Sequence, residues 1–302
     1  MTTVNTVVLA GASGSLGKAV LKALIASDKF DLTVLSREGS DRAFPPTVRV
    51  IKVDYGSIDQ LTAALKEKDA VISTLSGDAI DVQETLIQAA VAAGVKRFIP
   101  SEFSSDIGNP KTAGLPVYQS LIRIQGLLQE TAKAAPEFTY TPIRNGAFLD
   151  WGLALGFQVN LRSDHPPFFD GGDRPFSTTT LATIADAVVA ILGHLDETRN
   201  RAVYVHDVVT TQQHLLGLAR KVAPERHWEP VQVSTEELAR VSRDSYSKGQ
   251  FDLQASMGFF SRAVFAEGYG GEFQQVDNEL LGLGLKTDAD LEIILRDVLA
   301  SV

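Results

Sequence analysis

Three glycines near the N-terminus stand at a spacing that can bind phosphate. Gly11, Gly14 and Gly17 lie in the run GASGSLG, directly after the apolar segment VNTVVLA and before a helical pattern. Gly11 would permit a tight turn, Gly14 would let the backbone approach a pyrophosphate, and Gly17 would let the helix pack closely on a sheet. Free N–H groups at the helix start would face the phosphates. The predicted dinucleotide-binding residues here are Gly11, Ser13, Gly14, Ser15, Leu16 and Gly17. The alternative is a structural turn without a ligand.

The end of the second predicted strand indicates which dinucleotide this turn would bind. NAD sites usually carry an acidic residue there, which holds the ribose 2′-hydroxyl. This strand ends in Ser36 and Arg37. A guanidinium would attract a 2′-phosphate, and a hydroxyl could donate a hydrogen bond to it. The sequence therefore predicts NADP(H), although Glu38 follows directly and Arg37 could instead be a solvated surface residue.

The elements that would position these residues alternate between strands and helices. Apolar, β-branched runs predict strands at 4–10, 31–36, 48–53, 69–75, 95–100 and 138–144. Helical periodicity falls between them, at 16–25, 58–66, 81–93 and 115–134. This alternation predicts an α/β fold of Rossmann type, a doubly wound parallel sheet with helices on both faces.

The alternation weakens after Gly146, which predicts a second, smaller lobe. Residues 163–176 are rich in Gly, Pro and Phe and predict an ordered loop, followed by a helix at 181–192 and a strand at 202–205. The rest is mainly helical. We predict a Rossmann domain over 1–150 and a substrate lobe over 151–302, with 181–206 returning to the Rossmann domain.

Composition excludes several classes of function. The chain has no cysteine, and its five histidines show no metal-ligand spacing, so no metal site is predicted. The net charge is −9, with the acidic excess mostly in the second half, which argues against direct contact with nucleic acid. No run is apolar enough for a membrane span, and the N-terminus does not resemble a signal peptide. These features predict a cytoplasmic protein, and they leave a homodimer open.

Five segments resemble the NmrA-like and isoflavone-reductase-like family of atypical short-chain dehydrogenases. They are GASGSLG at 11–17, SRE at 36–38, VISTLSG at 71–77, VKRFIPSEFSSD at 95–106 and FTYTPIRNGAFLDWGL at 138–153. The resemblance implies an NADPH-binding core, a smaller C-terminal lobe and a small-molecule substrate. It also implies further cofactor-binding residues, namely Thr74, Leu75, Ser76, Ser101, Glu102, Phe103, Asn145, Gly146 and Phe148. All of them follow predicted parallel strands, at the edge where open α/β sheets bind ligands.

The resemblance also directs attention to a tyrosine and to a missing lysine. Short-chain dehydrogenases generally use a Tyr hydroxyl as an acid, with a helical Lys that lowers its pKa. Tyr118 stands where this Tyr could be, but the Lys position is Leu121 by the reductase spacing or Ile122 by the general spacing. Without a nearby cation, Tyr118 should keep a pKa near ~10. Ser101 matches the usual place of a substrate-orienting hydroxyl, and it could equally cap the following turn.

Two functions follow from these features. The first is an NADPH-dependent reductase of a small, aromatic or conjugated carbonyl compound, with Tyr118, Ser101 or water supplying the proton. The second is a non-catalytic NADP(H)-binding redox sensor that acts through a protein partner, which the missing Lys favours. Reuse of the fold for redox-neutral chemistry is a third alternative.

Overall fold

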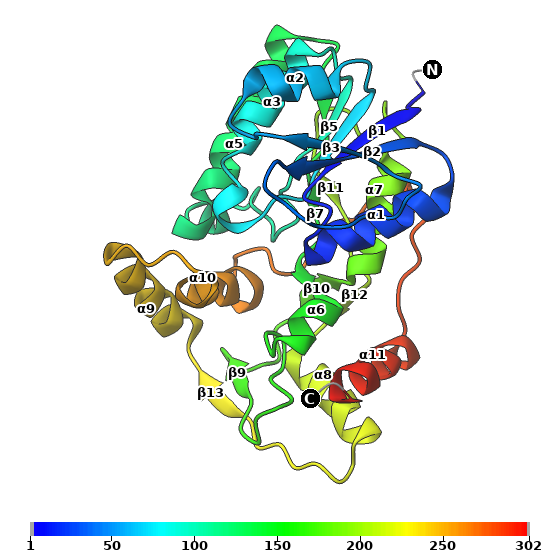
Figure 1. Ribbon diagram of the computed structural model, residues 1–302. Coiled ribbons are helices and arrows are strands. Elements are labelled where there is room, and N and C mark those ends of the chain that lie inside the picture. Colours follow the sequence, from blue (N-terminus) through cyan, green and yellow to red (C-terminus); the bar gives the residue numbers. More distant parts are fainter. Residues whose placement is uncertain (1–2, 301–302) are drawn as a thin grey trace. The chain divides into compact units, whose positions relative to one another are not determined.

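The computed structural model describes residues 3–300, which divide into two compact units (Figure 1). The first unit comprises Met1–Phe103, Ser120–Ile143 and Ile184–Val203, and the second comprises Ser104–Gln119, Arg144–Thr183 and Tyr204–Val302. The prediction placed 1–150 in the Rossmann domain, with 181–206 returning to it; the first unit includes Ile184–Val203 but leaves out Ser104–Gln119 and ends its middle stretch at Ile143. The chain leaves the first unit as soon as the fifth strand has ended, because Ser104 bonds through its carbonyl oxygen to the N–H groups of Asn145 and Gly146 in the second unit.

A six-stranded parallel sheet forms the centre of the first unit. Its strands are β1 (Thr6–Ala10), β2 (Asp31–Arg37), β3 (Arg49–Val53), β4 (Ala70–Ser73), β5 (Arg97–Ile99) and β6 (Thr139–Tyr140). Their order is β3-β2-β1-β4-β5-β6. This is the order of the Rossmann fold, and it reverses between β1 and β4, where such sheets bind their ligands. The predicted fold class is thus confirmed.

Helices cover both faces of this sheet. Figure 1 shows α2 (Ile58–Leu65), α3 (Gln83–Ala92) and α5 (Gln119–Ala134) together on one side and α1 (Ser15–Ser27) on the other. The apolar face of α2, α3 and α5 packs with strand residues in one buried core, to which these helices contribute Leu61, Leu65, Leu86, Ile87, Ile124 and Leu128. Burial of this face stabilises helices that are individually short.

The second unit contains short strands and most of the later helices. Its helices are α4 (Pro110–Ala113), η2 (Pro116–Tyr118), α6 (Leu149–Ala154), α8 (Gln212–Val222), α9 (Thr235–Ser247), α10 (Leu253–Phe265) and α11 (Asp288–Ala300). Its strands are β8 (Ala147–Phe148), β9 (Pro167–Phe169), β10 (Phe176–Thr179), β12 (Val208–Thr210) and β13 (Val231–Val233). Phe168, Phe169, Phe176 and Phe265 lie in its buried core.

Four elements contain a point where the chain passes from one unit to the other. They are α5, at its first residue, and β7 (Ile143–Arg144), α7 (Leu181–Ile191) and β11 (Val203–Tyr204). β7 and β11 pair with each other. Within residues 3–300, no helix is both long enough and apolar enough to cross a membrane.

Three predicted elements differ from the observed ones. The helix predicted over 115–134 is divided: Pro116–Tyr118 form a separate 3₁₀ turn, with Pro116 at its first position where no N–H is needed, and α5 begins at Gln119. The strand predicted over 138–144 is broken into β6 and β7 by Thr141 and Pro142. The loop predicted over 163–176 contains β9 and the start of β10.

Candidate functional site

A pocket of about 420 Å³ opens beside the glycine turn in the first unit. It is lined by Gly11, Ala12, Ser13, Gly14, Leu35, Ser36, Arg37, Ser40, Arg42, Phe44, Tyr55, Thr74, Leu75, Ser76, Ala79 and Val82. Eight predicted cofactor-binding residues are thus brought together. Of the other residues predicted in the first unit, Ser15, Leu16, Gly17, Ser101, Glu102 and Phe103 do not line this pocket.

The three glycines have different surroundings, and the fold excludes a side chain at Gly11 and Gly17 but not at Gly14. Gly11 has φ +86°, and a Cβ there would lie 2.7 Å from the backbone of Thr74 on the neighbouring strand end. A Cβ on Gly17 would overlap the carbonyl oxygen of Gly11, so this glycine allows the close packing of α1. Gly14 has an ordinary φ of −72°, and its Cβ would meet only Gly11 O at 3.6 Å. A side chain at Gly14 would therefore fit the fold.

The start of α1 can bind an anion. Its N-cap residue is Gly14, which offers no side chain to cap the helix. The first N–H groups of a helix have no partner within the helix, and the helix dipole makes this end positive. The glycine turn and the helix start thus form a cradle suited to a pyrophosphate.

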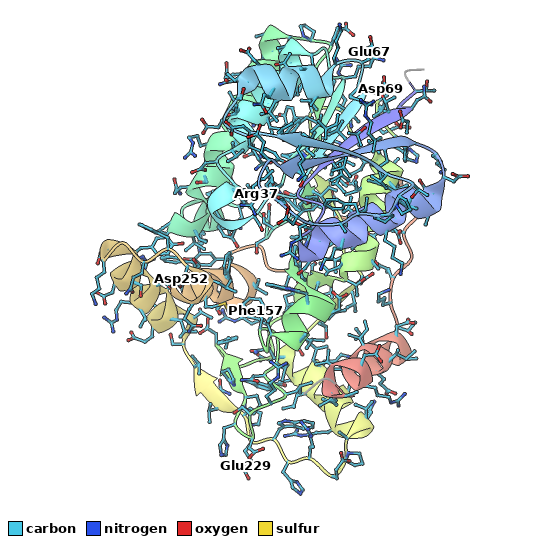
Figure 2. The ribbon with its side chains drawn as sticks, in the orientation of Figure 1. Arg37, Glu67, Asp69, Phe157, Glu229 and Asp252 are labelled. Atoms are coloured by element: carbon cyan, nitrogen blue, oxygen red, sulfur yellow. The ribbon has the colours of Figure 1, made fainter. Side chains whose placement is uncertain are left out.

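Two cations line the same pocket as the glycine turn. Arg37 ends β2 and is labelled in Figure 2, and it lines the pocket together with Ser36. Arg42 lines it as well, and both side chains also line an adjoining hollow of about 550 Å³ formed by residues 37 and 39–42. We find no ion pair for either guanidinium among the described residues. Sequence reasoning missed Arg42, although a second cation five residues after the strand end was the available signal.

Two aromatic residues in the pocket were also missed. Phe44 is half-buried, and Tyr55 is buried with its hydroxyl donating to Leu35 O at 3.1 Å. Burial raises the pKa of Tyr55 well above its usual range, so its hydroxyl stays protonated. No periodicity marks either residue, because both lie outside regular elements.

The segments after β4 and β5 are tied to each other. Thr74 donates through Oγ1 to Ala10 O at 2.9 Å, which fixes the end of β4 beside the glycine turn. Ser101 donates through Oγ to Leu75 O at 2.6 Å, so its hydroxyl links two strand ends and does not cap its own turn. Glu102 is buried, and Phe103 has φ +24°, which is rare for a residue with a side chain.

Three predicted cofactor-binding residues lie in the second unit. Asn145 is fully buried, and its Oδ1 has no hydrogen-bond partner among the described residues, whereas its Nδ2 donates to Gly146 O at 2.9 Å. A buried acceptor without a partner is costly, and a bound water or ligand would satisfy it. Gly146 has φ +64°, and a Cβ there would overlap Ser177 O. Phe148 is half-buried, with its ring 6.0 Å from that of Trp151.

Tyr118 is more deeply buried than the sequence suggests. It is 3% exposed, its hydroxyl donates to Ser105 Oγ at 3.2 Å, and its ring packs edge-on against Phe260. Burial raises the pKa of Tyr118 to about 12, so the expectation of an ordinary pKa near 10 was wrong. Arg123 does not act on Tyr118, because it pairs with Asp81 and Glu84 at 2.6 Å each.

The raised pKa gives a prediction for the stability of the protein. A tyrosine whose folded pKa lies above the unfolded value of ~10 stabilises the fold at and below that pH, and this contribution is lost as the pH rises towards 12. We therefore expect the unfolding free energy of wild type to fall more steeply between pH 10 and 12 than that of Tyr118→Phe. Denaturant titrations of both proteins across this range measure the difference. Parallel curves would contradict the burial of a protonated hydroxyl.

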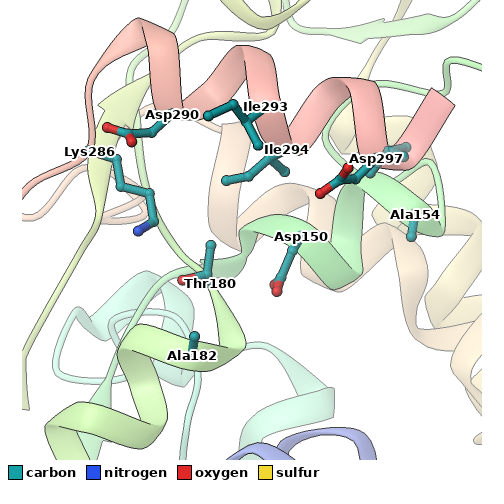
Figure 3. Close-up of a pocket in the computed structure, with 10 residues that line it drawn as sticks. Asp150, Ala154, Thr180, Ala182, Lys286, Asp290, Ile293, Ile294 and Asp297 are labelled. Atoms are coloured by element: carbon teal, nitrogen blue, oxygen red, sulfur yellow. The ribbon is translucent and has the colours of Figure 1, made fainter. Parts of the chain in front are cut away.

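A second pocket, of about 490 Å³, lies in the second unit and contains none of the predicted site residues (Figure 3). Asp290, Ile293, Ile294 and Asp297 of α11 face Asp150 of α6 and Thr180 across it. Its Lys286 lies 3.6 Å from the buried carboxylate of Asp207. No glycine lines this pocket, so it has no counterpart of the glycine turn in the first unit.

Comparisons with known proteins agree with this geometry. The model of the NmrA-like family matches residues 3–275. "Oxidoreductase poxI" of Penicillium oxalicum is 35% identical over 82% of this chain and 77% of its own, and "Oxidoreductase aprR" of Aspergillus flavus is 33% identical over 93% and 95%. The structure of leucoanthocyanidin reductase with NADPH from Vitis vinifera superposes with a TM-score of 0.80 at 20% identity, covering 98% of this chain and 100% of that one. The chain belongs to the NmrA-like family.

Proposed function

We propose that the protein binds NADP(H) and reduces a small aromatic or conjugated carbonyl compound. The observation that carries the proposal is the pocket of the first unit, which combines an open glycine turn with two arginines. None of its described side chains carries a carboxylate that would repel a 2′-phosphate. The relatives named oxidoreductases, and the NADPH complex of the structural neighbour, support the same function.

Different residues would bind different groups of the cofactor. The helix start at Gly14 would bind the pyrophosphate, and Arg37 and Arg42 would bind the 2′-phosphate. Asn145 would use its unpartnered Oδ1 to accept a hydrogen bond from the ligand. When bound, NADPH supplies a hydride from C4 of its nicotinamide. The substrate then needs one proton, which Tyr118, Ser101 or water would donate.

The two hydroxyls are poor proton donors as they stand. Tyr118 has a pKa of about 12, and the proton of Ser101 is used in its bond to Leu75 O. A simple ketone needs strong proton donation as the hydride arrives, whereas a quinone or an enone is already electrophilic. We therefore infer that the substrate belongs to the electrophilic, conjugated class. The aromatic rings of Phe148 and Trp151 suit a planar molecule of this kind.

This substrate class can be tested with a panel of compounds. We expect NADPH oxidation to be faster, by roughly tenfold or more, with quinones and enones than with saturated ketones, because general acid catalysis typically contributes ~10²–10⁴-fold. Leu121→Lys should raise ketone reduction by placing a cation near Tyr118 in the chain, and Gln129→Lys on the same helix is the control. Fast wild-type turnover of saturated ketones would overturn the inference.

The redox-sensor function remains the second candidate, favoured by Leu121 and by the deep burial of Tyr118. It predicts tight NADPH binding without turnover of any compound in the panel. The same panel, combined with calorimetry of NADPH binding, therefore decides between the two.

A further inference from the structure

A cluster of three side chains, with Arg144 buried and Asp106 and Tyr204 partly buried, joins separate segments of the second unit. The Arg144 side chain is 5% exposed, and its Nη1 donates to Asp106 Oδ1 at 3.1 Å and also to the hydroxyl of Tyr204. The Tyr204 hydroxyl in turn donates to Asp106 Oδ1 at 2.8 Å. Gly108 N donates to the same carboxylate oxygen at 3.0 Å. One guanidinium thus links the segment after β5, the end of β7 and the end of β11.

The cluster lies between two sets of predicted site residues. Asp106 follows Ser105, whose Oγ accepts the hydrogen bond of Tyr118. Arg144 directly precedes Asn145 and Gly146, and the N–H groups of both residues donate to Ser104 O at 3.2 Å. The segment Ser104–Gln119, which carries Tyr118, is therefore held to the strand end that carries Asn145. Hydrogen bonds to charged groups hold more strongly than the neutral bonds to Ser104.

We propose that Arg144 is a positioning residue for the reduction. Its guanidinium, through Asp106 and Tyr204, fixes the Ser104–Gln119 segment so that Tyr118 and Ser105 keep their place relative to Asn145 and Gly146. This inference rests on the proposed function. It assigns Arg144 no contact with substrate or cofactor.

Gly108 gives an independent way to disturb the cluster. A Cβ on Gly108 would overlap Arg144 Nη1 and would lie 3.0 Å from Asp106 Oδ1 and 3.1 Å from the Tyr204 hydroxyl. Gly108→Ala would thus displace the guanidinium without removing any polar group. This matters because Arg144→Met leaves the Asp106 carboxylate, which is 22% exposed, without its cation and can lower the stability of the fold.

The experiment combines kinetics with hydrogen–deuterium exchange on the full-length protein. For Arg144→Met and Gly108→Ala we expect kcat with the best panel substrate to fall roughly ten- to a hundredfold, since a displacement of ~1 Å can cost about 10²-fold. NADPH affinity should change little, because the glycine turn and the two arginines lie in the first unit. Amides of 104–119 should exchange faster, while those of α9 should not change. Arg174→Met and Gly217→Ala are the controls, because Arg174 is a partly exposed arginine and Gly217 has open space around its Cβ.

The outcomes separate the two proposals. Unchanged exchange over 104–119 in both variants would overturn the role of Arg144, whether or not the protein turns over a substrate. Faster exchange with an unchanged kcat would overturn it too, because the held segment would then not matter to the reaction. A wild type that binds NADPH but reduces nothing would instead overturn the proposed function, and exchange would still decide whether Arg144 holds the segment.

Discussion

Gly14→Val is expected to abolish NADPH binding while leaving the protein folded. The backbone φ of −72° suits any residue, and the new Cβ would meet only Gly11 O at 3.6 Å, so the fold can accept it. The branched side chain would occupy the space in which a pyrophosphate meets the helix start. Loss of two or more charge-assisted hydrogen bonds, each worth ~1.5–3 kcal/mol, lowers affinity by about a hundredfold or more.

Calorimetry of NADPH binding and circular dichroism measure the two halves of this prediction. Gly126→Val is the matched control, because Gly126 lies in α5 with nothing within 4 Å of its Cβ. Gly17→Ala should behave in the opposite way and lower stability, since its Cβ would overlap Gly11 O. A folded Gly14→Val protein that binds NADPH normally would show that the turn has only a structural role.

Removal of Arg37 and Arg42 is expected to erase the preference for NADPH over NADH. Each guanidinium can make a charge-assisted contact with the 2′-phosphate, so each Arg→Ala change should weaken NADPH binding roughly ten- to a hundredfold. NADH lacks this phosphate, and its affinity should stay nearly constant. The double variant should therefore bind both cofactors about equally.

Titration of both cofactors against wild type and the three variants provides the measurement. Arg49→Ala is the control, because Arg49 is an exposed arginine of the first unit that does not line the pocket. The preference should also shrink in high salt, as screening weakens exposed charge contacts. Equal affinities of the wild type for NADPH and NADH would refute the assignment of these arginines.

The first half of the fold could be predicted from the sequence because its signals are local. Each parallel strand is a short β-branched run, and each connecting helix has its own apolar face, so period and spacing define both. The glycine turn could be predicted in the same way, since Gly11, Gly14 and Gly17 follow the first strand directly. Three other residues that line the pocket could not be predicted. Arg42, Phe44 and Tyr55 lie in irregular segments, and only the folded chain brings them to Gly14.

The burial and the raised pKa of Tyr118 could not be predicted from the sequence, and the reason is physical. The pKa of a tyrosine depends on its burial, and burial depends on segments far away in the chain, such as α10 with Phe260. The departure of the chain from the first unit at Ser104 was hidden for the same reason, whereas the return over 181–206 was among the predictions. No loss of periodicity marks Ser104, because its partners at residues 145 and 146 lie some forty positions later.

The discontinuous make-up of the first unit affects how the protein can be synthesised. Domains generally fold as units during translation, beginning from the N-terminus. Here the last stretch of the first unit is Ile184–Val203, so the unit lacks its buried Ile184, Val188 and Ile191 until this stretch has left the ribosome. A nascent chain, or a fragment ending at residue 150, would expose the apolar surface that these residues cover. The first unit therefore matures only after Val203 has been synthesised, and no contiguous gene segment encodes it by itself.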